Sequence, residues 1–223
     1  MVEVRFLGHS AFLLVDGEDR VLIDPFISDN PLATASVEKL DPTLILVTHA
    51  HDDHLGDAIE LSKASGAPVL ATFEVANFCE DQGASSIPAH MGGEIDFPFG
   101  PVKLFPAWHS SSYQGRALGN PCSFLVRMRG KGIFHAGDTC LFSDMRLIGE
   151  EGVDLALLPI GGGFTMGIDD AVRAARFLEA GAVVPMHYAT FDFIDVDPKE
   201  FCRKVQESGI DCRVLGINEG YGL

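Results

Sequence analysis

Apolar residues recur along this chain in short runs, each ended by glycine, proline or polar side chains. Runs of this length with β-branched and aromatic residues are typical of strands. The run 43–47 is apolar along almost its whole length, which predicts a strand buried on both faces. The predicted strands are 2–7, 10–15, 20–24, 43–47, 67–72, 94–97, 102–108, 123–129, 132–136, 154–159, 183–186 and 214–217.

Helices are predicted where apolar residues return every three or four positions, at 57–65, 74–82 and 169–180. A last helix begins at Asp197-Pro198, a strong start signal, and ends at Gly209. Strands come first with a helix among them, then more strands, then helices alternating with strands. This order predicts an α/β (α+β) fold, a four-layer αββα sandwich of two packed sheets with helices outside. No linker divides the chain, so residues 1–223 are predicted to form one domain.

Composition changes this picture little. The chain is 47% hydrophobic, enough for a core that needs no disulfides. Its cysteines are odd in number, widely spaced and without C-x-x-C, so buried reduced thiols are expected rather than a disulfide framework or zinc knuckle. These are Cys79, Cys122, Cys140, Cys202 and Cys212. No membrane-length apolar segment or signal peptide is visible, which predicts a cytoplasmic protein.

The net charge limits the classes of molecule that the protein is expected to bind. The net charge is −16, and no run of Lys or Arg stands out. Such a surface repels nucleic acid and anionic membranes. We therefore expect a small-molecule substrate in preference to nucleic acid, and no membrane association, while a homo-oligomer stays open.

The candidate chemistry is concentrated in Thr48–Asp57, directly after the apolar run 44–47. Imidazole and carboxylate groups presented together at a strand end are suited to binding zinc, iron or manganese. In an extended loop His49 and His51 point the same way and can share one metal. Asp53 and His54 point apart from that pair and suit a second metal.

Three more candidate ligands follow predicted strands elsewhere. His109 follows 102–108, Asp138 follows 132–136, and His187 follows 183–186. Because ligand sites of α/β folds lie at the carboxyl ends of strands, these side chains are expected to converge on the histidine cluster.

The pattern H-x-H-x-D-H, a later His, Gly137-Asp138-Thr139 and a final His resembles the metallo-β-lactamase superfamily. Leu7–Phe12, Leu158–Gly162 and Thr165-Met166-Gly167 further resemble a branch of small metal-dependent hydrolases related to the ascorbate-6-phosphate lactonases. The resemblance implies an αββα sandwich with a dinuclear metal site between its sheets.

Carried over by position, the resemblance implies two divalent metal ions, Zn foremost with Mn or Fe as alternatives. The first would be held by His49, His51 and His109, the second by Asp53, His54 and His187, with Asp138 bridging. Asp138 and Asp53 would be the catalytic residues. True β-lactamases typically carry Cys at the position of Asp138, so an Asp argues against antibiotic hydrolysis and favours esters, lactones or phosphodiesters.

The function expected is hydrolysis of a small ester, lactone or phosphorylated substrate by a hydroxide held between two metals. A phosphodiesterase or nuclease is the alternative within the same chemistry. A mononuclear iron oxygenase and a non-catalytic metal-binding protein are alternatives of another class.

Further residues are assigned around this site. His9 is placed at the active-site rim or in a structural role, and Thr165 and Met166 are expected to line the substrate pocket with Phe164. The glycines at 161–163 lack the Lys and Ser/Thr of a P-loop. We expect the backbone of these glycines to pass close to the metal site. His135 is expected to pack or hydrogen-bond within the sheet.

Overall fold

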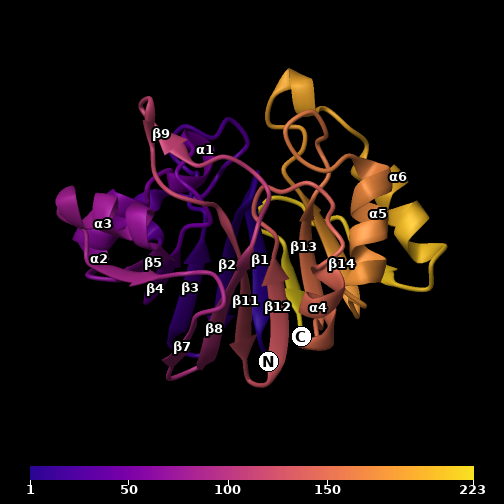
Figure 1. Cartoon of the computed structure of the whole chain (residues 1–223), viewed down its shortest axis with the longest axis horizontal. Coiled ribbons are helices and arrows are strands. Elements are labelled where there is room, and N and C mark those ends of the chain that lie inside the picture. The colour runs from indigo at the N-terminus through magenta and orange to yellow at the C-terminus, as the bar shows by residue number, and fades with distance from the viewer.

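Two large mixed sheets lie face to face in the computed structural model, which describes residues 1–223 (Figure 1). The first has the order β16-β1-β2-β3-β4-β5-β6, and the second β15-β14-β13-β12-β11-β8-β7. The first contains β1 Glu3–Gly8, β2 Ala11–Asp16, β3 Asp19–Ile23, β4 Leu44–Leu46, β5 Val69–Thr72, β6 Ser86–Ala89 and β16 Gly220–Gly222. The second contains β7 Glu94–Phe97, β8 Gly100–Pro106, β11 Cys122–Met128, β12 Lys131–His135, β13 Leu155–Pro159, β14 Ala182–Met186 and β15 Asp211–Cys212.

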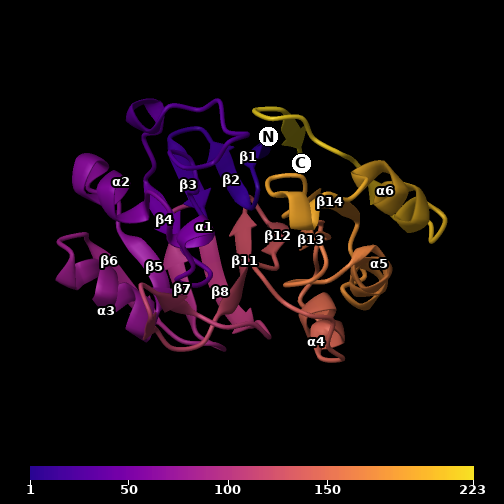
Figure 2. The ribbon, with the colours of Figure 1, turned by 90° about the horizontal axis from the view of Figure 1, so that it is seen from above.

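Helices cover the outer faces of both sheets (Figure 2). Helices α2 and α3 contact β5 and β6, whereas α5 and α6 contact β13, β14 and β15. This arrangement confirms the αββα sandwich. The helices are α1 Asp52–Leu55, α2 Ala58–Ser65, α3 Phe73–Asp81, α4 Met145–Glu150, α5 Ile168–Phe177 and α6 Pro198–Gln206, with 3-10 turns η1 Val37–Lys39 and η2 Asp192–Ile194. None of them is long and apolar enough to cross a membrane.

The strand β4 shows why its sequence is apolar throughout. Leu44 and Leu46 face the core between the sheets, which also contains Phe12 and Phe124. Its alternate residue Ile45 faces a second core beneath α2 and α3. Successive strand residues point to opposite faces, so a strand covered on both sides needs apolar residues at every position.

The C-terminal strand prediction is wrong. No strand forms at 214–217; instead β15 and β16 flank this segment, and β16 pairs antiparallel with β1. This pairing brings the two chain ends together, as Figure 1 shows. The helices α1 and α4, the strand β6 and the hairpin of β9 Ser112–Tyr113 with β10 Arg116–Ala117 were not predicted. The helices and the hairpin are too short to show a period in the sequence, and β6 has Pro88 inside it, a residue that strands disfavour.

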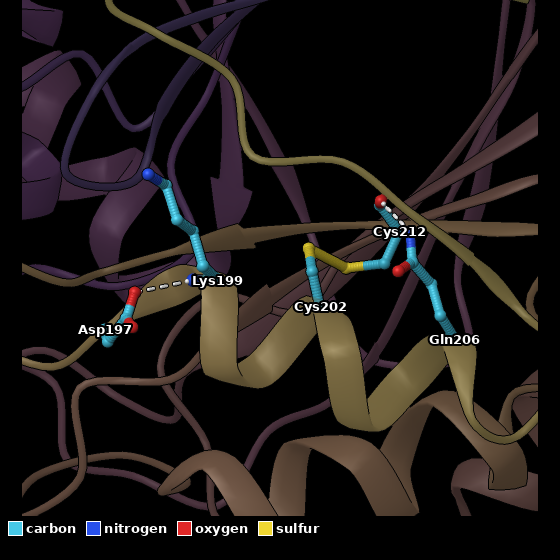
Figure 3. The surroundings of a disulfide bond; sticks show 5 residues. All are labelled: Asp197, Lys199, Cys202, Gln206 and Cys212. Carbon is cyan, nitrogen blue, oxygen red and sulfur yellow. Dashed lines mark hydrogen bonds between the residues drawn. A yellow bond between two sulfur atoms is a disulfide. The ribbon is translucent and has the colours of Figure 1, made fainter.

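The prediction of buried reduced thiols is wrong for three of the five cysteines, because two form a disulfide and Cys140 is a free but exposed thiol. Cys202 on α6 and Cys212 on β15 form a disulfide, beside which Gln206 Nε2 donates to the Cys212 carbonyl at 3.1 Å (Figure 3). After α6 the chain turns back and lays β15 alongside the helix, so residues ten apart come to face each other. Spacing alone gave no sign of this turn. Cys79 and Cys122 are buried free thiols, as expected.

The start of α6 follows its sequence signal. The Asp197 side chain accepts a hydrogen bond from the Lys199 backbone N–H at 2.9 Å, also drawn in Figure 3. This bond satisfies one of the free N–H groups of the first helical turn. The helix start predicted at Asp197-Pro198 is therefore confirmed.

Candidate metal centre

The candidate ligands lie at the carboxyl ends of strands that run in the same direction. In the first sheet β1, β3 and β4 share one direction, and in the second β8, β12 and β14 do. Polar residues follow each of these ends, and the sandwich brings them together. In chain order they are His9, Asp24, His49, His109, Asp138 and His187.

A first group of possible metal ligands consists of His49, His51 and His109, whose ring nitrogens lie within 4.8 Å of one another. His49 Nε2 and His51 Nδ1 are 3.0 Å apart. Burial lowers the pKa of His49 well below its ordinary value and lowers those of His51 and His109 too. Neutral imidazoles keep the lone pair that binds a metal. The outer nitrogen of His51, Nε2, lies 3.2 Å from the Ser110 hydroxyl.

A second group consists of His9, Asp53, His54 and His187. The short helix α1 begins at Asp52, so Asp53 and His54 lie in a helical turn. The sequence analysis had assumed an extended loop here. This turn is why they diverge from the first pair. Asp53 Oδ2 lies 3.9 Å from His54 Nε2 and 3.8 Å from His187 Nε2.

Asp138 lies between the two groups. Its carboxylate oxygens are 3.3 Å from His54 Nε2, 3.6 Å from His109 Nε2 and 3.1 Å from His187 Nε2. Asp138 Oδ1 and His54 Nε2 are both buried and have no hydrogen-bond partner. Buried polar atoms are almost always bonded. Two unbonded buried atoms aimed at the same space fit metal ligands.

The carboxylates determine the charge of this centre. Burial opposes protonation of His54, but Asp138, Asp53 and Asp24 outweigh it and raise the His54 pKa well above its ordinary value. Burial likewise opposes ionisation of Asp138, yet His54 and His187 keep the Asp138 pKa well below its usual range. Three carboxylates around one buried imidazole therefore favour positive charge in this space, and a bound metal cation could supply it.

Asp24 is the functional candidate that the sequence analysis missed. It is fully buried, and its Oδ2 accepts from His54 Nδ1 at 2.7 Å. The same carboxylate accepts from the backbone N–H of Thr48 at 2.8 Å and from its hydroxyl at 2.7 Å. Asp24 thus orients His54 so that Nε2 points at Asp138. The signal was present, because Asp24 ends the predicted strand 20–24, and in the structure it directly follows β3 as the candidate ligands follow their strands.

Comparison with known proteins identifies this arrangement. The profile of the beta-lactamase superfamily domain matches residues 3–187. The UPF0173 metal-dependent hydrolase of Thermus thermophilus is 52% identical over 220 residues, covering 98% of each chain. Its counterpart in Thermococcus kodakarensis is 47% identical over 214 residues, covering 92% of each. The chain belongs to the metallo-β-lactamase superfamily.

A solved structure agrees with this assignment. Igni18, a metallo hydrolase from Ignicoccus hospitalis, has a TM-score of 0.92 and 38% identity, covering 99% of this chain and 97% of its own. The chain is therefore a metal-dependent hydrolase of the metallo-β-lactamase superfamily. The closer relation to ascorbate-6-phosphate lactonases stays a prediction.

A cavity of about 390 Å³ opens onto the metal centre of this hydrolase. Its walls combine candidate ligands with Ser110 and an aromatic cluster: His51, Asp53, His109, Asp138, His187, Phe164, Phe191 and Phe193. A wider hollow of about 740 Å³ adjoins it, sharing His51, Asp53 and Phe191 and adding Asp52.

The predicted pocket residues are placed differently. Met166, within the 161–167 loop, is buried against the hydrophobic core, and its backbone N–H donates to the Thr139 carbonyl. Thr165 is not among the residues that line the cavity, whereas Phe164 is. His9 is fully buried behind Asp53 and does not line it either. The side chains that reach the cavity from this side come instead from Phe164 and from the segment around η2.

Proposed function

We propose that the chain holds two divalent metal ions. His49, His51 and His109 would bind the first, Asp53, His54 and His187 the second, and Asp138 would bridge them. The observation that carries this proposal is the buried Asp138 carboxylate, which lies within 3.6 Å of histidines from both groups. Mixed imidazole and carboxylate ligation suits Zn foremost, and also Mn or Fe.

When bound, two such cations lower the pKa of a coordinated water from about 15.7 towards 7 and polarise the scissile carbonyl. The protein's own contribution begins at Asp53, whose partly buried carboxylate faces the cavity. We propose that Asp53 holds the proton taken from the attacking water and passes it to the leaving oxygen. Asp138 would keep that water oriented towards the substrate.

His9 supports Asp53 in this role. Burial lowers the His9 pKa to about 4, so the ring is neutral at pH 7. Its Nε2 lies 3.0 Å from Asp53 Oδ2 and its Nδ1 2.9 Å from the Thr190 hydroxyl. An ionised carboxylate only accepts, so Nε2 carries the proton and Nδ1 accepts from Thr190. This chain of bonds fixes the direction of the Asp53 carboxylate.

The reaction we propose is hydrolysis of a small carboxylic ester or lactone. Phosphodiester cleavage is the second candidate, because the same metals stabilise a phosphoryl oxygen. A net charge of −16 and a cavity lined by neither Lys nor Arg argue against nucleic acid as the substrate.

The test compares hydrolysis of γ-butyrolactone and of bis(p-nitrophenyl) phosphate by zinc-loaded protein. Asp138→Ala should lower lactone turnover by more than about 100-fold, beyond the effect typical of losing an outer partner. Asp96→Ala, an exposed carboxylate on β7, is the matched control and should retain full rate. Undiminished turnover in Asp138→Ala would refute the bridging role. Turnover of the phosphodiester alone would favour the second candidate.

A further inference from the structure

One wall of the cavity is aromatic, and its residues are neither candidate metal ligands nor part of the proton transfer proposed for Asp53. It consists of Phe164, from the 161–167 loop, and Phe191 and Phe193, around η2. Phe164 and Phe193 are each 64% exposed. Large apolar side chains clustered in the open at the mouth of a site mark a surface that another molecule covers.

This wall has a fixed shape. The rings of Phe191 and Phe193 stack with centroids 5.4 Å apart, and Phe164 meets Phe193 edge-on at the same separation. Phe191 in turn packs edge-on against the buried His9 ring at 5.7 Å. Through His9 the wall is therefore tied to Asp53, which faces the same cavity.

The backbone behind the wall is anchored as well. Ile194 is completely buried, and its N–H donates to the Phe191 carbonyl. The backbone of Gly161 passes so close that a Cβ there would lie 2.8 Å from the Ile194 Cβ. The two loops that carry the phenylalanines are thus locked together. A preformed apolar surface binds its ligand without a cost for ordering the loops.

The charge of the surroundings excludes one class of substituent. Neither the cavity nor the adjoining hollow is lined by Lys or Arg. The hollow is instead lined by Asp29, Asp52 and Asp57. A phosphate on the substrate, away from the metals, would meet no cation and several carboxylates. Phosphate sites in proteins are built from Arg, Lys or clustered backbone N–H groups.

We infer that the substrate is an uncharged ester or lactone whose aryl-sized apolar substituent packs on Phe193, between Phe164 and Phe191, while its carbonyl lies at the metal centre. This inference rests on the proposed function. It names the substrate class and sets aside phosphorylated substrates.

The test uses three lactones with one ring and different substituents. These are γ-butyrolactone, its γ-phenyl derivative, and the phosphate ester of its γ-hydroxymethyl derivative. With zinc-loaded protein, the phenyl group should raise kcat/KM by about 10-fold or more, as expected for burial of a phenyl ring. The phosphorylated lactone should be the poorest substrate. Phe193→Ala should remove most of the phenyl advantage, while Phe73→Ala, an exposed phenylalanine on α3 outside the cavity, should keep it.

A binding measurement separates this inference from the proposed function. Acetohydroxamate and phenylacetohydroxamate share one metal-binding head and differ only in the phenyl group. Calorimetry on zinc-loaded protein should show about 10-fold tighter binding of the phenyl compound, lost in Phe193→Ala and kept in Phe73→Ala. Equal affinities, or faster turnover of the phosphorylated lactone than of the phenyl one, would overturn the inference. No turnover of any lactone would refute lactone hydrolysis, and the hydroxamates would then decide separately whether the aromatic wall binds an aryl group.

Discussion

At the residue scale, the metal centre depends on which hydrogen-bond donors or cations its buried carboxylates find. Asp24 and Asp138 approach His54 from its two ring nitrogens, at 2.7 Å and 3.3 Å. An unmatched buried charge is costly, so each of these carboxylates needs a donor or a cation. Asp24 finds three donors in the protein, whereas one oxygen of Asp138 finds none. The first is therefore an orienting group and the second a candidate ligand.

Asp24→Asn tests this difference. The amide NH₂ would face either the Nδ1–H of His54 or the backbone N–H of Thr48, in each case two donors without an acceptor. Either arrangement disturbs the bond that fixes the direction of the imidazole. We expect zinc affinity to fall about 10- to 100-fold, the range typical of lost outer partners. Competition with a chromophoric chelator measures it. Asp41→Asn, which changes an exposed carboxylate paired with Arg20, should leave affinity unchanged. An Asp24→Asn variant with the affinity of the parent would show that Asp24 has no orienting role.

At the element scale, strand ends made the site predictable. His109, Asp138 and His187 were found because each follows an apolar run, and the structure places them at the ends of β8, β12 and β14. What the sequence could not supply is the pairing between distant segments. The bond from His9 to Thr190 spans 181 residues, and the aromatic wall depends on two loops that meet only in the folded chain. The cysteine pair was missed for the same reason.

The contact between the two site loops can be broken at one glycine. A Cβ on Gly161 would clash with the His187 carbonyl oxygen and with Ile194. We expect Gly161→Ala to destabilise the fold by about 1–3 kcal/mol, as overpacking does, and to weaken zinc binding by displacing His187. Thermal unfolding and chelator competition measure the two effects.

Gly167→Ser is the matched control for this change. A Cβ at Gly167 meets nothing within 4 Å, and serine suits its position at the start of α5. This variant should keep both stability and zinc affinity. If Gly161→Ala also keeps both, the loops are not locked together as described.

At the scale of the whole molecule, the site joins the two sheets, and we propose that residues 1–223 act as one domain for this reason. His135, at the end of β12, donates from Nε2 to the Ser10 carbonyl in the turn between β1 and β2, at 2.9 Å. Its Nδ1 accepts from the Gly137 N–H at 3.1 Å. The same ring thus connects the sheets and holds the turn that presents Asp138.

This histidine predicts a pH dependence of stability. Burial lowers the His135 pKa below its ordinary value of about 6.5, so the folded protein keeps the ring neutral while the unfolded chain takes up a proton. The contribution of His135 to the free energy of unfolding is complete above pH 6.5. It is lost as the pH falls towards the lower pKa of the folded state. Urea unfolding of chelator-treated protein between pH 7.5 and 5 should show it. In His135→Gln the slope should be smaller by up to about 1.4 kcal/mol per pH unit. Identical slopes would show that His135 does not remain neutral in the fold.

The central claim is that one chain holds two metal ions bridged by Asp138, and counting them tests it most directly. Protein dialysed against zinc and desalted would be measured by inductively coupled plasma mass spectrometry. We expect two zinc ions per chain in the wild type, and one or fewer in Asp138→Ala. One ion per wild-type chain, or two in both proteins, would contradict the account.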